Sequence, residues 1–304
     1  MKNKRLGFVI SFAVILILLC GYLAGNYFVS YALQRDPSNP ESIPEACAEI
    51  HDPTRKIPPI PAHENSEWQM ISADGLKLDA TYFPNPSHNW AILVHGYGRD
   101  KRYAYDYAEE YLKRGFNVVV PNLRASGTSE GTYLTMGVKE SEDVRGWISK
   151  IVEQDPESKI VLHGVSMGAA TVLLAAEYES SKNLVAVVED CGYTSAYEMF
   201  SMQLEKIFGL PSFPIMNFVD IVSYIKTGAM ISDAAPIERI RSITVPVLFI
   251  HGDADGLVPI EMMERMFEAC LSEKRKLIFE NVGHADSMQA DPAKYFGTIF
   301  EFLK

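Results

Sequence analysis

The feature that most restricts the fold is an alternation of short apolar runs with longer stretches of helical spacing, from about residue 91 to the C-terminus. The runs, which have the length and composition of buried strands, are residues 91–96, 116–122, 159–164, 183–191, 245–252 and 275–280. The helical stretches are residues 102–115, 139–155, 167–179, 260–271 and 292–303. Strands that alternate with helices form a mostly parallel sheet with helices on both faces, so the sequence predicts a doubly wound α/β fold.

Two further segments complete this prediction. Residues 67–85 have the composition of two strands around Asp74-Gly75, a strong turn signal, and predict an antiparallel hairpin in front of the parallel strands. Residues from about 193 to 243 interrupt the alternation and are rich in Phe, Met, Ile and Leu. We expect them to form a small helical cap over the ligand site, with apolar side chains that pack on the core and line a pocket.

The N-terminal segment has the properties of a transmembrane helix. No charge occurs from Leu6 to about Gly25, and about 20 apolar residues suffice to cross a bilayer. Lys2, Lys4 and Arg5 precede the run, which predicts a cytoplasmic N-terminus and an extracytoplasmic remainder. The alternative is a cleaved signal peptide and a secreted protein. The run is longer than the apolar core of about 7–15 residues usual in signal peptides, which favours a single-pass signal anchor in the cell membrane.

These features divide the chain into three parts. Residues 1–33 form the cytoplasmic N-terminus and membrane anchor, and residues 65–304 form the catalytic domain that includes the cap. Residues 34–64 between them are rich in proline and predict a tether, with a short helical turn at 48–53 (AEIHDP).

Composition excludes several kinds of function. The formal net charge of −11 argues against a nucleic-acid-binding surface, which needs clustered Lys and Arg. None of the four cysteines forms a CxxC pair, so zinc and thioredoxin-like sites are disfavoured. The sequence DADG at 253–256 hints at a calcium loop, but Leu257 and Val258 stand where such a loop needs a ligand and a glycine. We therefore expect no metal and no organic cofactor.

Residues that could carry out catalysis directly follow the predicted strands, which is where ligands bind in open α/β sheets. After the third apolar run, Ser166 lies between Gly164 and Gly168 and directly before a helix. A serine at a sharp strand-to-helix turn is exposed as a nucleophile, and small neighbours let the backbone double back on itself. A serine hydroxyl needs a base, and the base needs an orienting acid. Asp255 and His284 follow later strands in the order that such a turn predicts.

Other residues compete for these roles. Asp253 lies in the same loop as Asp255, but the spacing to the following Val-Pro favours Asp255 as the acid. Glu189 and Asp190 close the fourth run, and we expect them to be structural. Three histidines that precede glycines at strand ends are expected to pack and to bond within loops: His95, His163 and His251.

An oxyanion site requires two backbone N–H groups aimed at the developing negative charge. The N–H of Met167, at a helix start, is one candidate, and the helix dipole favours it. The N–H of Tyr97, in the loop after the first apolar run, is the other.

In these motifs the chain resembles the α/β-hydrolases. The resemblance is nearest to the monoglyceride-lipase and serine-aminopeptidase branch, which has membrane-anchored bacterial members. The matching motifs are HGYG (95–98), PNLRASGTSEG (121–131), GVSMG (164–168), HGDADGLVP (251–259) and VGH (282–284). The resemblance implies Ser166 as nucleophile, Asp255 as acid, His284 as base, and Tyr97 and Met167 as oxyanion donors. One departure is Asn122, where many relatives have Asp; the position is expected to organise its loop.

The predicted function is hydrolysis of carboxylic esters through a Ser-His-Asp triad and an acyl-enzyme, as in carboxylesterases and lipases (EC 3.1.1). The expected substrate is a small-molecule or lipid-like ester with a hydrophobic acyl group, and the expected membrane contact is through the N-terminal helix. Two alternatives stay open at the level of sequence: a peptidase or thioesterase that uses the same triad, and a non-catalytic hydrolase-like binding protein.

Overall fold

The computed structural model describes the chain except for residues 1, 37–38, 40–42, 44–45, 47–55 and 179–181. The helical turn expected at 48–53 therefore lies outside the described residues, as does much of the predicted tether.

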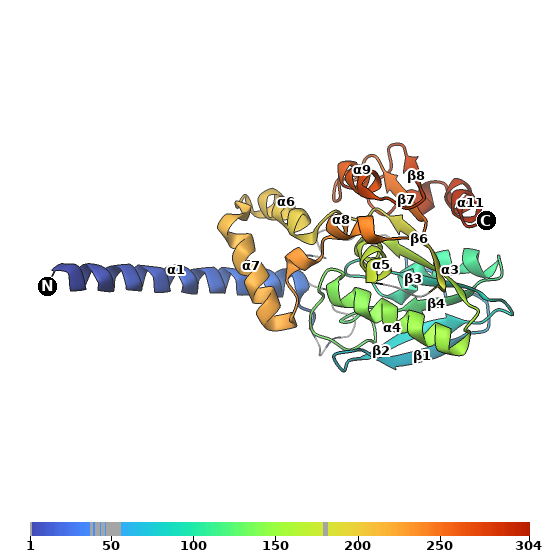
Figure 1. The fold of residues 1–304 in the computed structure, drawn as a ribbon, viewed down its shortest axis with the longest axis horizontal. Coiled ribbons are helices and arrows are strands. Elements are labelled where there is room, and N and C mark those ends of the chain that lie inside the picture. Colours follow the sequence, from blue (N-terminus) through green and yellow to red (C-terminus); the bar gives the residue numbers. More distant parts are fainter. Residues whose placement is uncertain (1, 37–38, 40–42, 44–45, 47–55, 179–181) are drawn as a thin grey trace.

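An eight-stranded sheet forms the centre of the domain (Figure 1). Its strands are β1 (Ser66–Ile71), β2 (Lys77–Phe83), β3 (Asn89–Val94), β4 (Asn117–Pro121), β5 (Lys159–Val165), β6 (Leu184–Asp190), β7 (Val247–Gly252) and β8 (Lys274–Phe279). The spatial order is β1-β2-β4-β3-β5-β6-β7-β8. β2 pairs antiparallel with β1 and β4, and all other neighbours are parallel. The predicted hairpin and the predicted parallel sheet are both confirmed.

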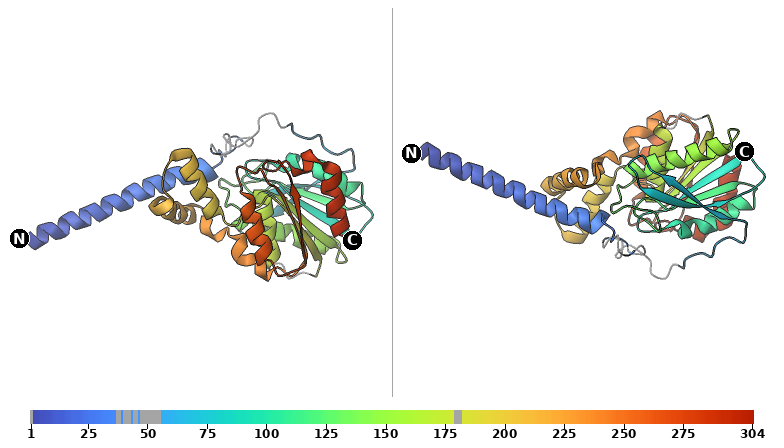
Figure 2. Two further views of the ribbon diagram at one scale, coloured as in Figure 1. Left: turned by 90° about the horizontal axis from the view of Figure 1, so that it is seen from above. Right: turned by 90° about the horizontal axis from the view of Figure 1, so that it is seen from below.

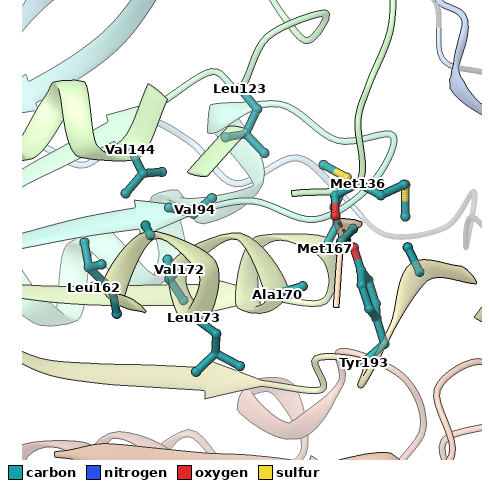
Figure 3. Close-up of a cluster of buried hydrophobic side chains, with 14 of the residues drawn as sticks. Val94, Leu123, Met136, Val144, Leu162, Met167, Ala170, Val172, Leu173 and Tyr193 are labelled. Carbon is teal, nitrogen blue, oxygen red and sulfur yellow. Dashed lines mark hydrogen bonds between the residues drawn. The ribbon is translucent and has the colours of Figure 1, made fainter. Parts of the chain in front are cut away.

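Helices cover both faces of the sheet, which explains why the central strands are apolar throughout. Side chains of β3 alternate between two buried clusters: Trp90, Ile92 and Val94 join one, and Ala91 and Leu93 join the other. The first cluster includes α4 (Val138–Gln154), α5 (Met167–Tyr178) and α9 (Ile260–Ala269), and Figure 3 shows part of it around α5. The second includes α3 (Tyr105–Leu112) and α11 (Pro292–Phe302). The first predicted helix begins as a 3-10 turn, η1 (Lys101–Ala104), and a further short helix is α10 (Ser287–Ala290).

The segment between β6 and β7 forms the expected helical cap. Its main elements are α6 (Ala196–Phe208) and α7 (Ser212–Thr227), followed by the short elements η2 (Ile231–Asp233), α8 (Pro236–Arg239) and η3 (Ile240–Ser242). Ser195 caps the start of α6 by accepting a hydrogen bond from the backbone of Glu198, and Gly209 ends it in a left-handed conformation. Figure 1 shows α6 and α7 at the end of the domain from which the N-terminal helix leaves.

That N-terminal helix, α1 (Lys2–Leu33), is the one helix among the described residues that is long and apolar enough to cross a membrane. It projects from the domain in all three views (Figures 1 and 2). Residues Leu6–Cys20 are exposed, and contact with the domain starts at Gly21. A Cβ atom at Gly21 would lie 2.3 Å from the ring of Phe218 in α7, and one at Gly25 would lie 2.7 Å from the Phe218 backbone oxygen. The two glycines, four residues apart, therefore allow α1 and α7 to pack closely.

The last turns of α1 are part of the domain core. Val29 and Leu33 are fully buried. The Leu33 carbonyl accepts a hydrogen bond from the backbone of Leu134 (2.9 Å), and the Arg35 backbone donates to the Thr132 carbonyl (2.8 Å). This docking was not predicted from the sequence, because the apolar run by itself indicates only a membrane anchor.

Replacement of Leu33 by Ala tests this docking. Removing a fully buried leucine side chain costs about 2–5 kcal/mol, so Leu33→Ala lowers the free energy of unfolding by that amount in detergent-solubilised protein. The control is Leu16→Ala, on the exposed part of the same helix, which leaves the unfolding of the domain unchanged. Denaturant unfolding followed by tryptophan fluorescence measures both, and equal stability of the two variants would refute the buried position of Leu33.

Candidate active site

Ser166 lies at the sharp turn between β5 and α5. Its φ of +58° is in the left-handed region, a strained conformation for a residue with a side chain. A Cβ atom at Gly164 would lie 2.1 Å from the Gly168 carbonyl oxygen, and one at Gly168 would lie 2.2 Å from the Val94 carbonyl oxygen. Both positions therefore require glycine, and the turn presses the start of α5 against the end of β3.

The structure brings the three predicted residues together. Nε2 of His284 lies 2.8 Å from Oγ of Ser166, and Nδ1 of His284 lies 2.7 Å from Oδ2 of Asp255. The first distance permits transfer of the hydroxyl proton to the imidazole, and the second fixes the orientation of the ring. The three side chains come from the loops after β5, β7 and β8, which end at one edge of the sheet.

Asp255 is held as a carboxylate. Its Oδ1 accepts hydrogen bonds from the backbone of Leu257 (2.9 Å) and Val258 (2.8 Å). Burial opposes its ionisation, but hydrogen bonds from His251 and His284 outweigh burial and hold the pKa of Asp255 far below the ordinary value. The carboxylate therefore stays charged at neutral pH and can stabilise an imidazolium at His284.

His251 packs and bonds within its loop as expected, but it also contacts Asp255, which was not predicted from the sequence. Its side chain is fully buried, and Nε2 lies 3.3 Å from Oδ2 of Asp255 and 2.9 Å from the Val258 carbonyl oxygen. Burial disfavours the imidazolium, yet the bond to Asp255 and the charge of Glu189 raise the pKa of His251 above its ordinary value. Two histidines thus share one carboxylate oxygen. The i, i+4 spacing of His251 and Asp255 across one turn was the signal that could have indicated this contact.

The competing carboxyl groups are placed differently. Oδ1 of Asp253 accepts a hydrogen bond from the backbone of Asn281 (2.6 Å), which is the loop role expected for it. Glu189 and Asp190 are fully buried at the end of β6, where Glu189 accepts from the backbone of Gly192 and Asp190 accepts from the Tyr295 hydroxyl. Burial raises the pKa of Glu189 to about 7 and that of Asp190 to about 6. A carboxyl with a raised pKa is a poorer partner for an imidazolium than Asp255.

The two predicted oxyanion donors flank the serine. Met167 is the first residue of α5, so its N–H has no partner within the helix. Tyr97 follows Gly96, whose Cβ position lies only 3.3 Å from Cβ of Ser166. The preceding His95 accepts a hydrogen bond from the backbone of Leu123 (3.1 Å), and burial lowers its pKa and keeps the ring neutral. The Tyr97 hydroxyl donates to the Ala32 carbonyl, so the last turn of α1 holds the loop that carries this donor.

The polar loop at 121–131 is held by buried side chains. Asn122 donates to both carboxylate oxygens of Asp79 (3.1 and 3.2 Å) and accepts from the backbone of Lys101 (2.8 Å). An aspartate at position 122 would place a second carboxylate against Asp79, so the amide of Asn122 suits this position. Buried Arg124 donates to Asp143 at 2.7 Å and to Asp74 at 2.8 Å, and so ties the loop to α4 and to the hairpin turn.

A cavity of about 620 Å³ opens above the serine. Ser166 and His284 line its floor, and Tyr97, Met136, Met167 and Tyr193 lie beside them. Figure 3 shows Met136, Met167 and Tyr193 close to one another at the start of α5. Its other walls come from α6 and α7 of the cap and, unexpectedly, from the last turns of α1. These wall residues include Phe28, Tyr31, Leu204, Phe208, Met216 and Val219.

One group of residues near the site has metal-binding side chains. Potential ligand atoms of Cys191, Asp255 and His284 lie within 4.8 Å of one another. Burial raises the pKa of Cys191 well above its ordinary value, so its sulfur is a thiol, whereas metals bind the thiolate. The other two side chains already bind each other. This donor set fits a hydrogen-bonded triad better than a metal centre.

Comparison with known proteins agrees with this geometry. The family model for X-Pro dipeptidyl-peptidases (S15 family) matches residues 74–227, just over half of the chain. An uncharacterised protein of Bacillus subtilis, YqkD, is 29% identical over 242 residues, which cover 79% of each chain. The protein bem46 of Schizosaccharomyces pombe is 26% identical and covers 96% of this chain and 90% of its own.

Two solved structures share the fold. A Pyrococcus furiosus esterase superposes with a TM-score of 0.66 at 24% identity, covering 83% of this chain and 98% of its own. An acylaminoacyl peptidase of Pyrococcus horikoshii superposes with a TM-score of 0.58 at 18% identity, covering 80% of this chain and 42% of its own. At such identities the likeness concerns the fold, which is that of the α/β-hydrolases. The narrower resemblance to the monoglyceride-lipase branch stays a prediction.

The S15 family model matches just over half of the chain, and a serine, a histidine and an aspartate are hydrogen-bonded in series at the strand ends. The chain therefore belongs to the X-Pro dipeptidyl-peptidase (S15) family and is a hydrolase of the α/β fold.

Proposed function

We propose that the protein is a carboxylesterase that cleaves esters of hydrophobic acyl groups, with Ser166, His284 and Asp255 as its catalytic triad. Oγ of Ser166 attacks the ester carbonyl while Nε2 of His284 takes the hydroxyl proton. The N–H groups of Tyr97 and Met167 stabilise the oxyanion, and Asp255 stabilises the imidazolium. His284 then gives its proton to the leaving alcohol, and water hydrolyses the acyl-enzyme by the same steps in reverse.

The observation that carries this proposal is the lining of the cavity above Ser166. The walls contributed by α1, α6 and α7 are made mainly of Phe, Tyr, Met, Leu and Val side chains, which suit an acyl chain. A dipeptidyl-peptidase must also bind the charged N-terminus of its substrate, which calls for carboxylates. Among the described residues of the lining, Asp286 is the one acidic side chain. The same lining also contains the basic residues Arg99 and Lys206.

Membership of the S15 family supports a second candidate, cleavage of peptides after an Xaa-Pro dipeptide. The triad itself serves esters, thioesters and amides alike, so the leaving group must be identified by assay. A non-catalytic binding role is disfavoured by the geometry, because nucleophile, base and acid are all present and lie within hydrogen-bonding distance in series.

A substrate panel tests the proposed function. Wild-type protein hydrolyses p-nitrophenyl esters, with kcat/KM rising from acetyl to octanoyl, and turns over Xaa-Pro p-nitroanilides far more slowly. Ser166→Ala loses at least about 10³-fold in kcat, since the residual rate comes from binding and the oxyanion site alone. Turnover of the anilides without the esters would instead support the peptidase. Ester hydrolysis that survives in Ser166→Ala would contradict the assigned nucleophile.

Two neighbouring aspartates give a matched test of the acid. Asp255→Asn removes the charge that holds and stabilises the His284 ring, so kcat falls by about 10³–10⁴-fold. Asp253→Asn, in the same loop, keeps kcat within about threefold of wild type, because the Asp253 side chain accepts a hydrogen bond from the Asn281 backbone that an amide oxygen can also accept. Steady-state kinetics with a short ester measure both. Similar losses in the two variants would remove the distinction between a catalytic and a loop carboxylate.

We further propose that α1 is an uncleaved anchor, with a cytoplasmic N-terminus and an extracytoplasmic catalytic domain. The basic residues before the apolar run support this orientation, and the packing of Gly21 and Gly25 on α7 supports retention of the helix. Leu271→Cys creates an exposed thiol on the catalytic domain. In intact cells whose outer layers admit the reagent, a membrane-impermeant maleimide labels this variant. Labelling that requires lysis of the cytoplasmic membrane would reverse the proposed orientation.

A further inference from the structure

The part of α1 that precedes its contact with α7 at Gly21 is too short to cross a bilayer alone. It runs from Leu6 to Cys20 and is about 22 Å long at the rise of an α-helix. The hydrocarbon core of a bilayer is about 30 Å thick and needs about 20 residues of helix. The apolar run continues without charge to about Gly25, so α1 can complete the span only if the turn from Gly21 to Gly25 also lies in the membrane.

That turn of α1 is the part that α7 covers. Gly21 and Gly25 pack directly against Phe218, near the middle of α7. In all three views α6 and α7 flank α1 where it joins the domain (Figures 1 and 2). A bilayer that reaches Gly25 must therefore also reach α7.

The outer side of the cap is suited to that environment. Three apolar residues of α7 are well exposed: Phe213 (76%), Ile225 (63%) and Ile221 (51%). Phe208, the last residue of α6, and Leu210, between α6 and α7, are exposed as well. Tyr224 of α7 and Tyr27 of α1 are both about half exposed, and tyrosines are enriched where a membrane meets water. The cap, which packs on α1 through α7, therefore exposes apolar side chains as α1 itself does.

The two charged side chains of α7, which is described in full, are satisfied on the protein side. Asp220 accepts hydrogen bonds from the backbone (2.9 Å) and hydroxyl (2.6 Å) of Ser232. Lys226 donates to the hydroxyl of Ser30 (3.2 Å) and lies over the ring of Tyr133. The exposed Glu205 and Lys206 of α6 are charged, so the uncharged face beside α1 consists of α7 and the last residues of α6. Such a face, packed on a membrane helix, is typical of a protein surface immersed in lipid.

From these observations we infer that α7 and the end of α6 are embedded in the surface of the bilayer beside α1, and that the active-site cavity receives the acyl chains of its substrates from the membrane. The cavity is lined by Phe28, Tyr31 and Ala32 of α1 and by Ile207 and Phe208 of α6, which belong to this same region. The acyl chain of a bilayer lipid ester can thus reach Ser166 along apolar walls without crossing water. The statement about substrates rests on the proposed esterase function, whereas the statement about membrane contact does not.

Fluorescence quenching tests the membrane contact independently of activity. The full chain, with Cys20 and Cys47 replaced by Ser, receives one new cysteine and a polarity-sensitive fluorophore, and is reconstituted into phosphatidylcholine vesicles that carry nitroxide-labelled lipid. A label at Ile225→Cys is strongly quenched. The control is Leu271→Cys, more exposed in the protein (75%) but far from α1 in sequence and on the loop after α9, where quenching is weak. Equal, weak quenching at both positions would overturn the inference.

An activity comparison tests delivery from the membrane. The double variant Ile221→Glu, Ile225→Glu places charges on the exposed face of α7, and neither residue lines the cavity. We expect it to hydrolyse a long-chain acyl ester embedded in the vesicles about tenfold more slowly, and soluble p-nitrophenyl butyrate within twofold of wild type. The control Leu271→Glu changes neither rate.

The outcomes separate the two proposals. Unchanged hydrolysis of both esters in the double variant would refute delivery from the membrane while leaving the esterase function intact. A wild-type protein that hydrolyses neither ester would refute the esterase function, and the quenching result would still decide whether the cap lies in the bilayer.

Discussion

The active site depends on the close contact of two glycines with neighbouring backbone. Gly164 and Gly168 let the chain reverse between β5 and α5 within van der Waals distance of itself and of the end of β3. This turn holds Ser166 at a positive φ, with its hydroxyl 2.8 Å from Nε2 of His284 and directly before the start of α5. Every other site residue needs only to reach that fixed point, which explains why His284 and Asp255 can lie on loops.

Much of this arrangement follows from local sequence patterns. Buried strands that alternate with helices predicted the parallel sheet, and the position of Ser166 between two glycines after a strand predicted the turn. Asp255 and His284 could be selected because both follow strands that end at the same edge of the sheet. The contact of His251 with Asp255 was missed because a buried histidine before a glycine has the same sequence appearance whether it packs or bonds to a carboxylate.

The larger omission concerns α1. An apolar run of this length is explained by a membrane span alone, so its sequence does not indicate that its last turns also pack in the domain core. The burial of Val29 and Leu33 depends on partners about 100 and 200 residues away in sequence. The spacing of Gly21 and Gly25 was the available signal, since small residues four positions apart allow close helix packing. Through the bond between the Tyr97 hydroxyl and the Ala32 carbonyl, α1 also contacts the loop that carries the proposed oxyanion donor Tyr97. Anchor, cap and catalytic loop are therefore parts of one packed structure.

Reaction with a fluorophosphonate tests whether His284 activates the Ser166 hydroxyl. The reagent forms a stable covalent bond only with a serine whose proton a neighbouring base removes. Treated full-length protein, digested and analysed by mass spectrometry, should carry one phosphonyl group, on the peptide that contains Ser166, and His284→Ala should abolish the modification. Folded wild-type protein that stays unmodified at Ser166, or a His284→Ala variant that reacts as fast as wild type, would contradict the account.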